Sequence, residues 1–370
     1  MKQFLIFSFV QLFFSFVLSG QWNALEFSAL PSTAIRHSSY ITSPYKNISQ
    51  QFQLGVMYIP KNNTTWYQYW NSPEINFRIG WLNFGDQKKL GDAFYILPEM
   101  GFSLYRVKKW NLLASVATGI AYLTKKYDRT GNPEHNAIGT NWNNITQFSL
   151  AGRYNLHSNI QFGAGIVLSH FSNGRTGTPN YGINLPGGQM SVRYYFNQQD
   201  TLVKRHNKQG PVQTNPSWGG DVLIGSGLSA YPVQGVSALP VYFVNAGARW
   251  KKSSYFHLII GSEWEYNESV YQFHYHDFDS DKTARKKATR TALYGAGELF
   301  FGNVSLRLQS GYYLPWPEER QNDFFPYYFR LGLQIYPVKM SSRFKPFIGV
   351  MMKSHAEKAQ FLGFATGILF

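Results

Sequence analysis

Cysteine is absent from this chain of 370 residues. Disulfide bonds, cysteine-ligated metals and thiol redox chemistry are therefore excluded. Charged residues are also scarce, at 15% of the sequence, against about a quarter in ordinary soluble domains. Beyond the first twenty residues there is no apolar run of the roughly 20 residues that a membrane helix needs, and the mean hydropathy is −0.28. The composition thus argues against a helical membrane protein and is unusual for a soluble domain.

The first twenty residues have the pattern of a secretory signal. Lys2 is followed by an apolar run over 4–18, and Ser19 and Gly20 are small residues suited to cleavage. We expect a signal peptide over 1–20 and an exported protein. An N-terminal membrane anchor is the alternative, but the run is short for a helical span.

Aromatic residues make up 18% of the chain, and its formal net charge is +15. A positive charge attracts polyanions such as nucleic acid or anionic lipid, and export makes nucleic acid a poor partner. Much of this charge consists of single arginines spread along candidate strands, which is also typical of a polar barrel lumen. The charge therefore indicates no particular ligand.

Apolar and polar residues alternate in segments of about ten residues, the length of a tilted membrane strand. In 304–312, Val304, Leu306 and Leu308 alternate with polar residues, and 256–265 and 327–336 repeat the pattern. The last segment ends on Phe370, which resembles the terminal strand of bacterial outer-membrane proteins. We predict an all-β protein, a transmembrane antiparallel β-barrel. A soluble β-sandwich also alternates and is the alternative.

Short turns alternate with long polar connections, as in barrels with periplasmic turns and external loops. This spacing predicts about 14 strands, between 12 and 16, in one barrel over 76–370. Residues 21–75, with a candidate strand at 51–60 and an aromatic cluster, form either a strand or a periplasmic cap. The polar stretch 197–217 does not fit this pattern, because it is long where a short turn is expected.

The segment 161–172 carries the candidate chemistry. Phe162, Ile166 and Leu168 occupy even positions, and His170 and Ser172 continue that face. Residues at i and i+2 of a strand project the same way, with α-carbons roughly 7 Å apart, so an imidazole and a hydroxyl can meet on the outer wall near the external rim. A base beside a serine makes it a nucleophile. Alternatively, His170 belongs to the interfacial girdle and Ser172 simply begins a loop.

The run HFSNG at 170–174, followed by PNYGIN at 179–184, resembles the signature of the outer-membrane lipid A 3-O-deacylases (PagL-type, often labelled acyloxyacyl hydrolases). The stretch NAIG at 136–139 is similar to longer members. The resemblance implies esterase chemistry with Ser172 as nucleophile and His170 as base. It also implies that Asn173 and Asn180 donate to the oxyanion, and it requires no metal and no cofactor.

Asn184 stands where the resembling family has a glutamate. An amide can orient His170 but supplies no negative charge to the imidazolium, and the equivalent change in a protease triad cost about 10⁴-fold. Glu134 and Asp128 in the preceding external loop are other candidates to orient His170. We therefore expect an enzyme whose activity depends on how Asn184 replaces the acid.

The predicted function is removal of an ester-linked acyl chain from lipid A of lipopolysaccharide, in the outer membrane of a Gram-negative cell. The partners are the membrane and lipid A, whose phosphates basic loop residues would bind. These residues are Lys125, Lys126, Arg129, Arg175, Lys282, Arg285, Lys286 and Lys287. Two alternatives stay open: a transport barrel, whose lumen would be wide at about 14 strands, and an inactive barrel that only binds lipopolysaccharide.

Overall fold

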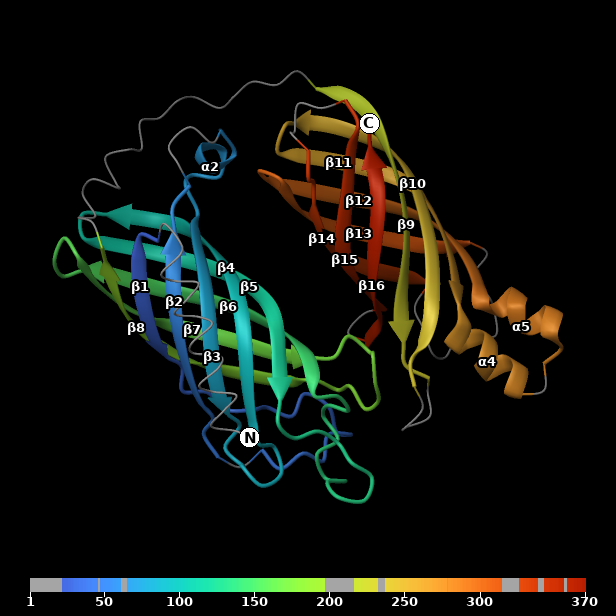
Figure 1. Ribbon diagram of the computed structural model, residues 1–370, viewed down its shortest axis with the longest axis horizontal. Coiled ribbons are helices and arrows are strands. Elements are labelled where there is room, and N and C mark those ends of the chain that lie inside the picture. Colours follow the sequence, from blue (N-terminus) through green and yellow to red (C-terminus); the bar gives the residue numbers. More distant parts are fainter. Residues whose placement is uncertain are drawn as a thin grey trace. The chain divides into compact units, whose positions relative to one another are not determined.

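The computed structural model describes residues 22–45, 47–60, 65–196, 216–231, 237–277, 279–314, 326–338, 343–355 and 358–370. These residues form sixteen antiparallel strands in two closed barrels of eight. Figure 1 shows the two barrels. The all-β class and the antiparallel barrel architecture agree with the sequence pattern. Within the described residues, no helix is long and apolar enough to cross a membrane.

The first barrel contains eight strands joined in sequence order and closed by pairing of the first with the eighth. They are β1 (Ala24–Ala29), β2 (Gln50–Tyr58), β3 (Glu74–Asn83), β4 (Asp92–Val107), β5 (Trp110–Leu123), β6 (Trp142–Asn155), β7 (Ile160–Ser172) and β8 (Ile183–Tyr195). A short helix, α2 (Thr65–Tyr69), lies between β2 and β3 and contains part of the aromatic cluster noted in the sequence.

The second barrel repeats this plan, with β9 pairing to both β10 and β16. Its strands are β9 (Ser217–Ser229), β10 (Leu239–Ser253), β11 (Phe256–Asn267), β12 (Thr289–Phe301), β13 (Val304–Leu314), β14 (Tyr327–Ile335), β15 (Lys345–His355) and β16 (Lys358–Leu369). Two helices, α4 (Glu268–His276) and α5 (Asp281–Ala288), extend from one end of this barrel between β11 and β12 (Figure 1). Asn267 and Ser280 cap their N-termini.

The predicted number of strands is confirmed, because β3 to β16 are fourteen strands, but the prediction that they form one barrel over 76–370 is wrong. Residues 21–75 contribute β1 and β2, and β1 closes the first barrel by pairing with β8, for example Phe27 with Val192. Since β8 ends at Tyr195 and β9 begins at Ser217, the polar stretch that did not fit the turn pattern connects the two barrels. Most of that stretch, and the expected signal peptide over 1–20, lie outside the described residues.

The chain separates into two compact units that follow the barrels, except at one loop. The first unit contains Met1–Asn173 and Tyr181–Gln209, and the second contains Gly174–Asn180 and Gly210–Phe370. The middle of the β7–β8 loop is thus assigned to the second unit. We describe each unit by itself.

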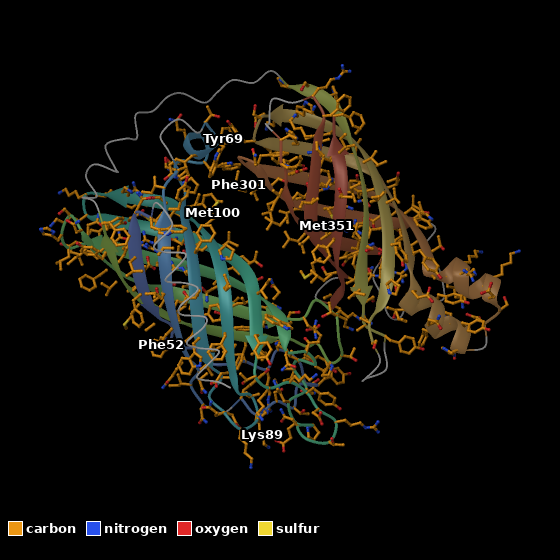
Figure 2. All side chains as sticks on the ribbon, in the orientation of Figure 1. Phe52, Tyr69, Lys89, Met100, Phe301 and Met351 are labelled. Carbon is orange, nitrogen blue, oxygen red and sulfur yellow. The ribbon has the colours of Figure 1, made fainter. Side chains whose placement is uncertain are left out.

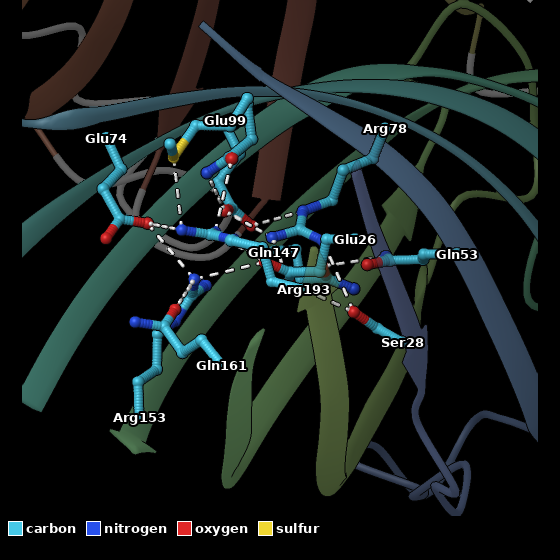
Figure 3. A network of polar contacts seen from close by, with 12 residues as sticks. Glu26, Ser28, Gln53, Glu74, Arg78, Glu99, Gln147, Arg153, Gln161 and Arg193 are labelled. Carbon is cyan, nitrogen blue, oxygen red and sulfur yellow. Dashed lines mark hydrogen bonds and ion pairs between the residues drawn. The ribbon is translucent and has the colours of Figure 1, made fainter. Parts of the chain in front are cut away.

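Buried charged side chains fill the lumen of the first barrel, as Figure 3 shows. Glu26 accepts from Arg78 at 2.9 Å and from Arg153 at 3.1 Å, and also pairs with Arg193. Glu99 pairs with Arg78 at 2.8 Å, and Glu74 with Arg193 at 2.7 Å and Arg153 at 3.2 Å. Three carboxylates thus face three guanidinium groups, so the charge of this network balances.

A comparable network fills the second lumen. Its carboxylates are Asp221, Glu263, Glu265 and Glu298, and its cations are Arg249, Arg307, Arg330 and Lys353, all nearly inaccessible. Eight-stranded barrels have interiors that side chains nearly fill. The wide lumen that made a transport barrel an alternative is therefore absent from the barrels that the described strands form.

The outer walls are apolar. Figure 2 shows Phe52 projecting from the first barrel, where 39% of its surface is exposed, while Lys89 lies in the β3–β4 loop. Antiparallel alternation brings the loops β1–β2, β3–β4, β5–β6 and β7–β8 to one end of the first barrel. This end carries the candidate site, and we call it the loop end.

A buried apolar cluster lies inside the loop end of the first barrel. Phe171 is fully buried there, with its ring centroid 5.4 Å from that of Phe84 and 6.4 Å from that of Tyr95. Since successive side chains of a strand alternate, fixing Phe171 inside directs its two neighbours outward. The cluster therefore sets the direction of His170 and Ser172.

Candidate active site on the outer wall

His170 and Ser172 lie at the end of β7 on its outward face, together with the exposed Phe162, Ile166 and Leu168. Both are partly buried. This is the face that the alternation predicts. Along β7 the outward side chains next to the pair are apolar, so the pair lies between an apolar part of the wall and the loop end.

Asn184 contacts the imidazole of His170. It lies on β8 directly opposite His170 in the strand register, and its Oδ1 is 2.6 Å from His170 Nδ1. The structure therefore brings together two of the three predicted catalytic residues by a hydrogen bond and places the third two positions along the same strand face.

His37, in the β1–β2 loop, extends this contact and was missed in the sequence. Its Nδ1 is 3.1 Å from Asn184 Nδ2, and its Nε2 is 2.9 Å from the carbonyl oxygen of Tyr181. Ile35 pairs with Asn184 as an isolated bridge, with Ile35 N–H donating to Asn184 O at 3.0 Å. No local sequence signal identifies His37, because 147 residues separate it from Asn184.

The stretch 136–139 supports the loops around the site. Asn136 donates to Tyr40 O at 2.6 Å and accepts from Thr42 N–H at 2.8 Å, which holds the β1–β2 loop. The carbonyl of Ala137 accepts from Gly182 N–H at 3.1 Å, which holds the β7–β8 loop. The similarity noted at this stretch thus corresponds to a structural role beside the candidate catalytic residues.

Gly182 lies directly against the imidazole. Its φ is +78°, in the region that favours glycine, and a Cβ built on it would lie 2.8 Å from His170 Cε1 and 3.1 Å from Phe171 O. Any side chain at this position would displace His170. Gly182, the glycine in the PNYGIN run, is therefore required for two reasons: its backbone lies close to His170, and its φ is positive.

Polar residues cross the outer wall in a row. Thr118 on β5, Thr146 on β6, His170 on β7 and Asn184 on β8 are successive partners in the strand register. In the next row Asn144 faces Ser172; it donates to Thr118 Oγ1 at 2.9 Å and accepts from Thr146 Oγ1 at 2.8 Å. We call Thr118, Asn144 and Thr146 the polar patch. It enlarges the site beyond the residues that the sequence singled out.

The two acidic candidates for orienting His170 have other partners. Glu134 pairs with Lys89. Asp128 accepts hydrogen bonds from Gly131 N–H and from Thr130, which hold the pKa of its carboxyl below its usual value. Neither forms the contact that Asn184 forms, so Asn184 is the residue at Nδ1 of His170.

Asn173 and Asn180 bracket the middle of the β7–β8 loop. Asn173 directly follows β7 and is 3% exposed, whereas Asn180 groups with the second unit. Their proximity to Ser172 in sequence is established, and their role toward an oxyanion stays a prediction.

The basic loop residues are dispersed over several elements. On α5, Arg285 pairs with Asp281 at 3.0 Å and Lys287 with Asp279 at 3.1 Å. Lys282 and Lys286 of the same helix are exposed.

Within the part of the chain that the structure describes, no group of three or more histidine, aspartate or glutamate side chains is arranged to hold a metal ion.

Family models match both barrels. The model described as lipid A 3-O-deacylase (PagL) matches residues 51–193, and the model described as acyloxyacyl hydrolase, C-terminal domain, matches residues 218–370. Together they cover most of the chain. The first match contains His170, Ser172 and Asn184, and the second contains the whole strand set from β10 to β16.

Among solved structures, the chain is similar to a double mutant and a triple mutant of the Rhodopseudomonas blastica porin. Each is 9% identical with a TM-score of 0.17; the alignments cover 94% and 95% of this chain, respectively, and 99% of the porin. No curated protein matches the chain.

Proposed function

Since this chain belongs to the lipid A 3-O-deacylase (PagL) family, we propose that it is an outer-membrane serine esterase that removes an ester-linked acyl chain from lipid A. The observation that carries this proposal is the arrangement of Ser172, His170 and Asn184 on the outer wall of the first barrel, with Asn184 Oδ1 2.6 Å from His170 Nδ1. A hydroxyl, an imidazole and an orienting group are the parts that acyl transfer needs.

In the proposed reaction His170 Nε2 takes the proton of Ser172 as its Oγ attacks the ester carbonyl carbon. The tetrahedral intermediate carries its negative charge on the former carbonyl oxygen, to which Asn173 and Asn180 donate hydrogen bonds. Collapse breaks the ester bond, and the departing sugar hydroxyl takes the proton from His170. Water then attacks the acyl-enzyme with His170 again as base, which releases a fatty acid and restores Ser172.

The outward direction of the site suits a substrate that stays in the membrane. Phe162, Ile166 and Leu168 extend along β7 below the pair, and each is more than 40% exposed. In a bilayer this surface contacts acyl chains, while the loop end reaches the headgroups. A lipid ester at that boundary can meet Ser172 without leaving the membrane.

The amide of Asn184 orients His170 without a negative charge. In a serine protease triad, the aspartate-to-asparagine change left the geometry intact and lowered kcat about 10⁴-fold, because the imidazole adopted the wrong tautomer. Activity here therefore depends on the amide presenting its oxygen to His170. In the structure it is Oδ1 of Asn184 that lies 2.6 Å from His170 Nδ1.

The test is mass spectrometry of lipid A incubated with the purified full chain. Ser172→Ala is expected to lower the yield of the deacylated species by about a thousandfold or more. Ser354→Ala, at the outward serine near the end of β15, is the matched control and is expected to leave the yield unchanged. Lipid A that binds to the unaltered chain and stays intact would contradict the esterase and favour the inactive lipopolysaccharide-binding barrel.

A further inference from the structure

We propose that His37 is a positioning residue that fixes the side-chain amide of Asn184 and, through it, the tautomer of His170. The inference deepens the proposed esterase and rests on it. It explains how an amide can stand in for an acid at this site. The observation that carries it is the chain of contacts from Tyr181 O through His37 and Asn184 to His170.

The direction of this chain follows from the carbonyl at its end. A backbone carbonyl oxygen only accepts hydrogen bonds, so the Nε2 of His37, 2.9 Å from Tyr181 O, carries a proton. In the neutral imidazole the other nitrogen then has a lone pair and accepts. His37 Nδ1 therefore accepts from the Nδ2 of Asn184 across 3.1 Å.

The orientation of Asn184 decides the tautomer of His170. With Nδ2 donating to His37, Oδ1 faces His170 and accepts from its Nδ1–H across 2.6 Å. The lone pair of His170 is then on Nε2, the nitrogen that the proposed reaction uses as base. In the opposite orientation the Nδ2 of Asn184 would donate to His170 Nδ1, which would then carry the lone pair, and the ring proton on Nε2 would block proton transfer.

A carboxylate would not need this support. Its two oxygens are equivalent acceptors, so either orientation fixes the same tautomer of a neighbouring histidine. An asparagine has one oxygen and one NH₂ group, and a third group must select between them. His37 is the described residue whose contact with Asn184 makes that selection.

The backbone holds His37 at the required place. The β1–β2 loop continues beside β8 after β1 ends, with Thr33 N–H donating to Pro186 O at 3.1 Å and Ile35 N–H to Asn184 O at 3.0 Å. Arg36 donates to Ser43 O at 3.2 Å across the same loop. His37 itself is exposed, so its replacement is expected to change the free energy of unfolding little.

The first experiment measures lipid A deacylation by the full chain in mixed micelles. His37→Leu is expected to lower kcat about tenfold or more with KM little changed, because the lost contact acts on the base and not on substrate binding. His37→Asn, whose Oδ1 can replace Nδ1 as acceptor, is expected to retain more of kcat than His37→Leu. Equal losses in the two variants would contradict the positioning role.

The same variants in the Asn184→Asp background form a double-mutant cycle. Because a carboxylate needs no selection, His37→Leu is expected to change kcat less than about twofold there. An undiminished loss in this background would overturn the inference, since it would show that His37 acts independently of residue 184.

A spectroscopic measurement separates this inference from the esterase itself. Nitrogen-15 NMR of the histidine-labelled full chain reports which ring nitrogen of His170 is protonated, whether or not lipid A is cleaved. We expect Nδ1–H in the unaltered chain and an increased Nε2–H fraction in His37→Leu, with His170→Gln assigning the signals. An Nε2–H tautomer in the unaltered chain overturns the inference, and failure of Ser172→Ala to reduce deacylation overturns only the esterase.

Discussion

The two barrels share an architecture and differ in what their outer walls carry. Each has eight strands, a lumen filled by balanced charges and an apolar exterior. In the first, the seventh strand ends with an outward histidine and an outward serine, His170 and Ser172. In the second, β15 ends with Ser354 outward, and His355 points into the lumen, where its Nε2 is 3.1 Å from the hydroxyl of Tyr313.

This difference is one of side-chain parity. A shift of one residue along a strand moves a side chain from one face to the other. The histidine of β15 is adjacent to its serine and so faces the opposite way, whereas that of β7 is two residues away and shares the face. The end of β7 therefore places a histidine and a serine on one face of the wall, and the end of β15 does not.

The largest difference between matched substitutions in the two barrels is expected at Gly182. Gly182→Ala is expected to lower deacylation about a hundredfold or more, because its Cβ would lie 2.8 Å from His170 Cε1 at a φ of +78°. Gly295→Ala on the outer wall of the second barrel, where a Cβ meets nothing within 4 Å, is the control. Comparable activity in the two variants, measured by lipid A mass spectrometry, would show that His170 need not stay where it lies.

Substitutions in the charged networks of the two lumens test whether each barrel is stable by itself. Glu26→Gln leaves three buried arginines opposite two carboxylates in the first barrel and is expected to lower its free energy of unfolding by about 3 kcal/mol. Glu298→Gln, which weakens the pair with Arg249, is expected to destabilise the second barrel similarly. Thermal unfolding of the full chain in detergent, with deacylation measured in parallel, checks both.

Only the first of these two changes is expected to reduce activity at temperatures near its unfolding midpoint, since the predicted catalytic residues lie in the first barrel. Loss of activity in Glu298→Gln at a temperature where the first barrel stays folded would mean that the second barrel contributes to catalysis.

The smallest effect is expected in the polar patch. Asn144 faces Ser172 in the strand register, and its outward amide contacts Thr118 and Thr146. Asn144→Leu removes the hydrogen bonds that hold Thr118 and Thr146, and we expect KM to rise about threefold to tenfold with kcat largely kept. Ser262→Leu, at an exposed position on β11, is the matched change in the second barrel, and a steady-state assay in mixed micelles compares them.

Local alternation was enough to predict much of this protein. It identified strands of membrane length, and it placed His170 and Ser172 on one face with Phe162 and Leu168. It did not identify β1, because six residues are too few for a ten-residue pattern, and without β1 the closure of the first barrel was not apparent. The polar connection between Tyr195 and Ser217 was recognised as irregular, but its meaning as a linker depends on that closure.

The sequence by itself determined the all-β class and the outward face of the candidate nucleophile and base, since each depends on neighbours a few residues apart. Only the tertiary structure decided that eight strands close twice and that His37 reaches Asn184. These depend on pairs such as Ala24 with Tyr195, or His37 with Asn184 across 147 residues. The physical reason is that strand periodicity fixes which way a side chain points, while the partner it meets is chosen by barrel closure.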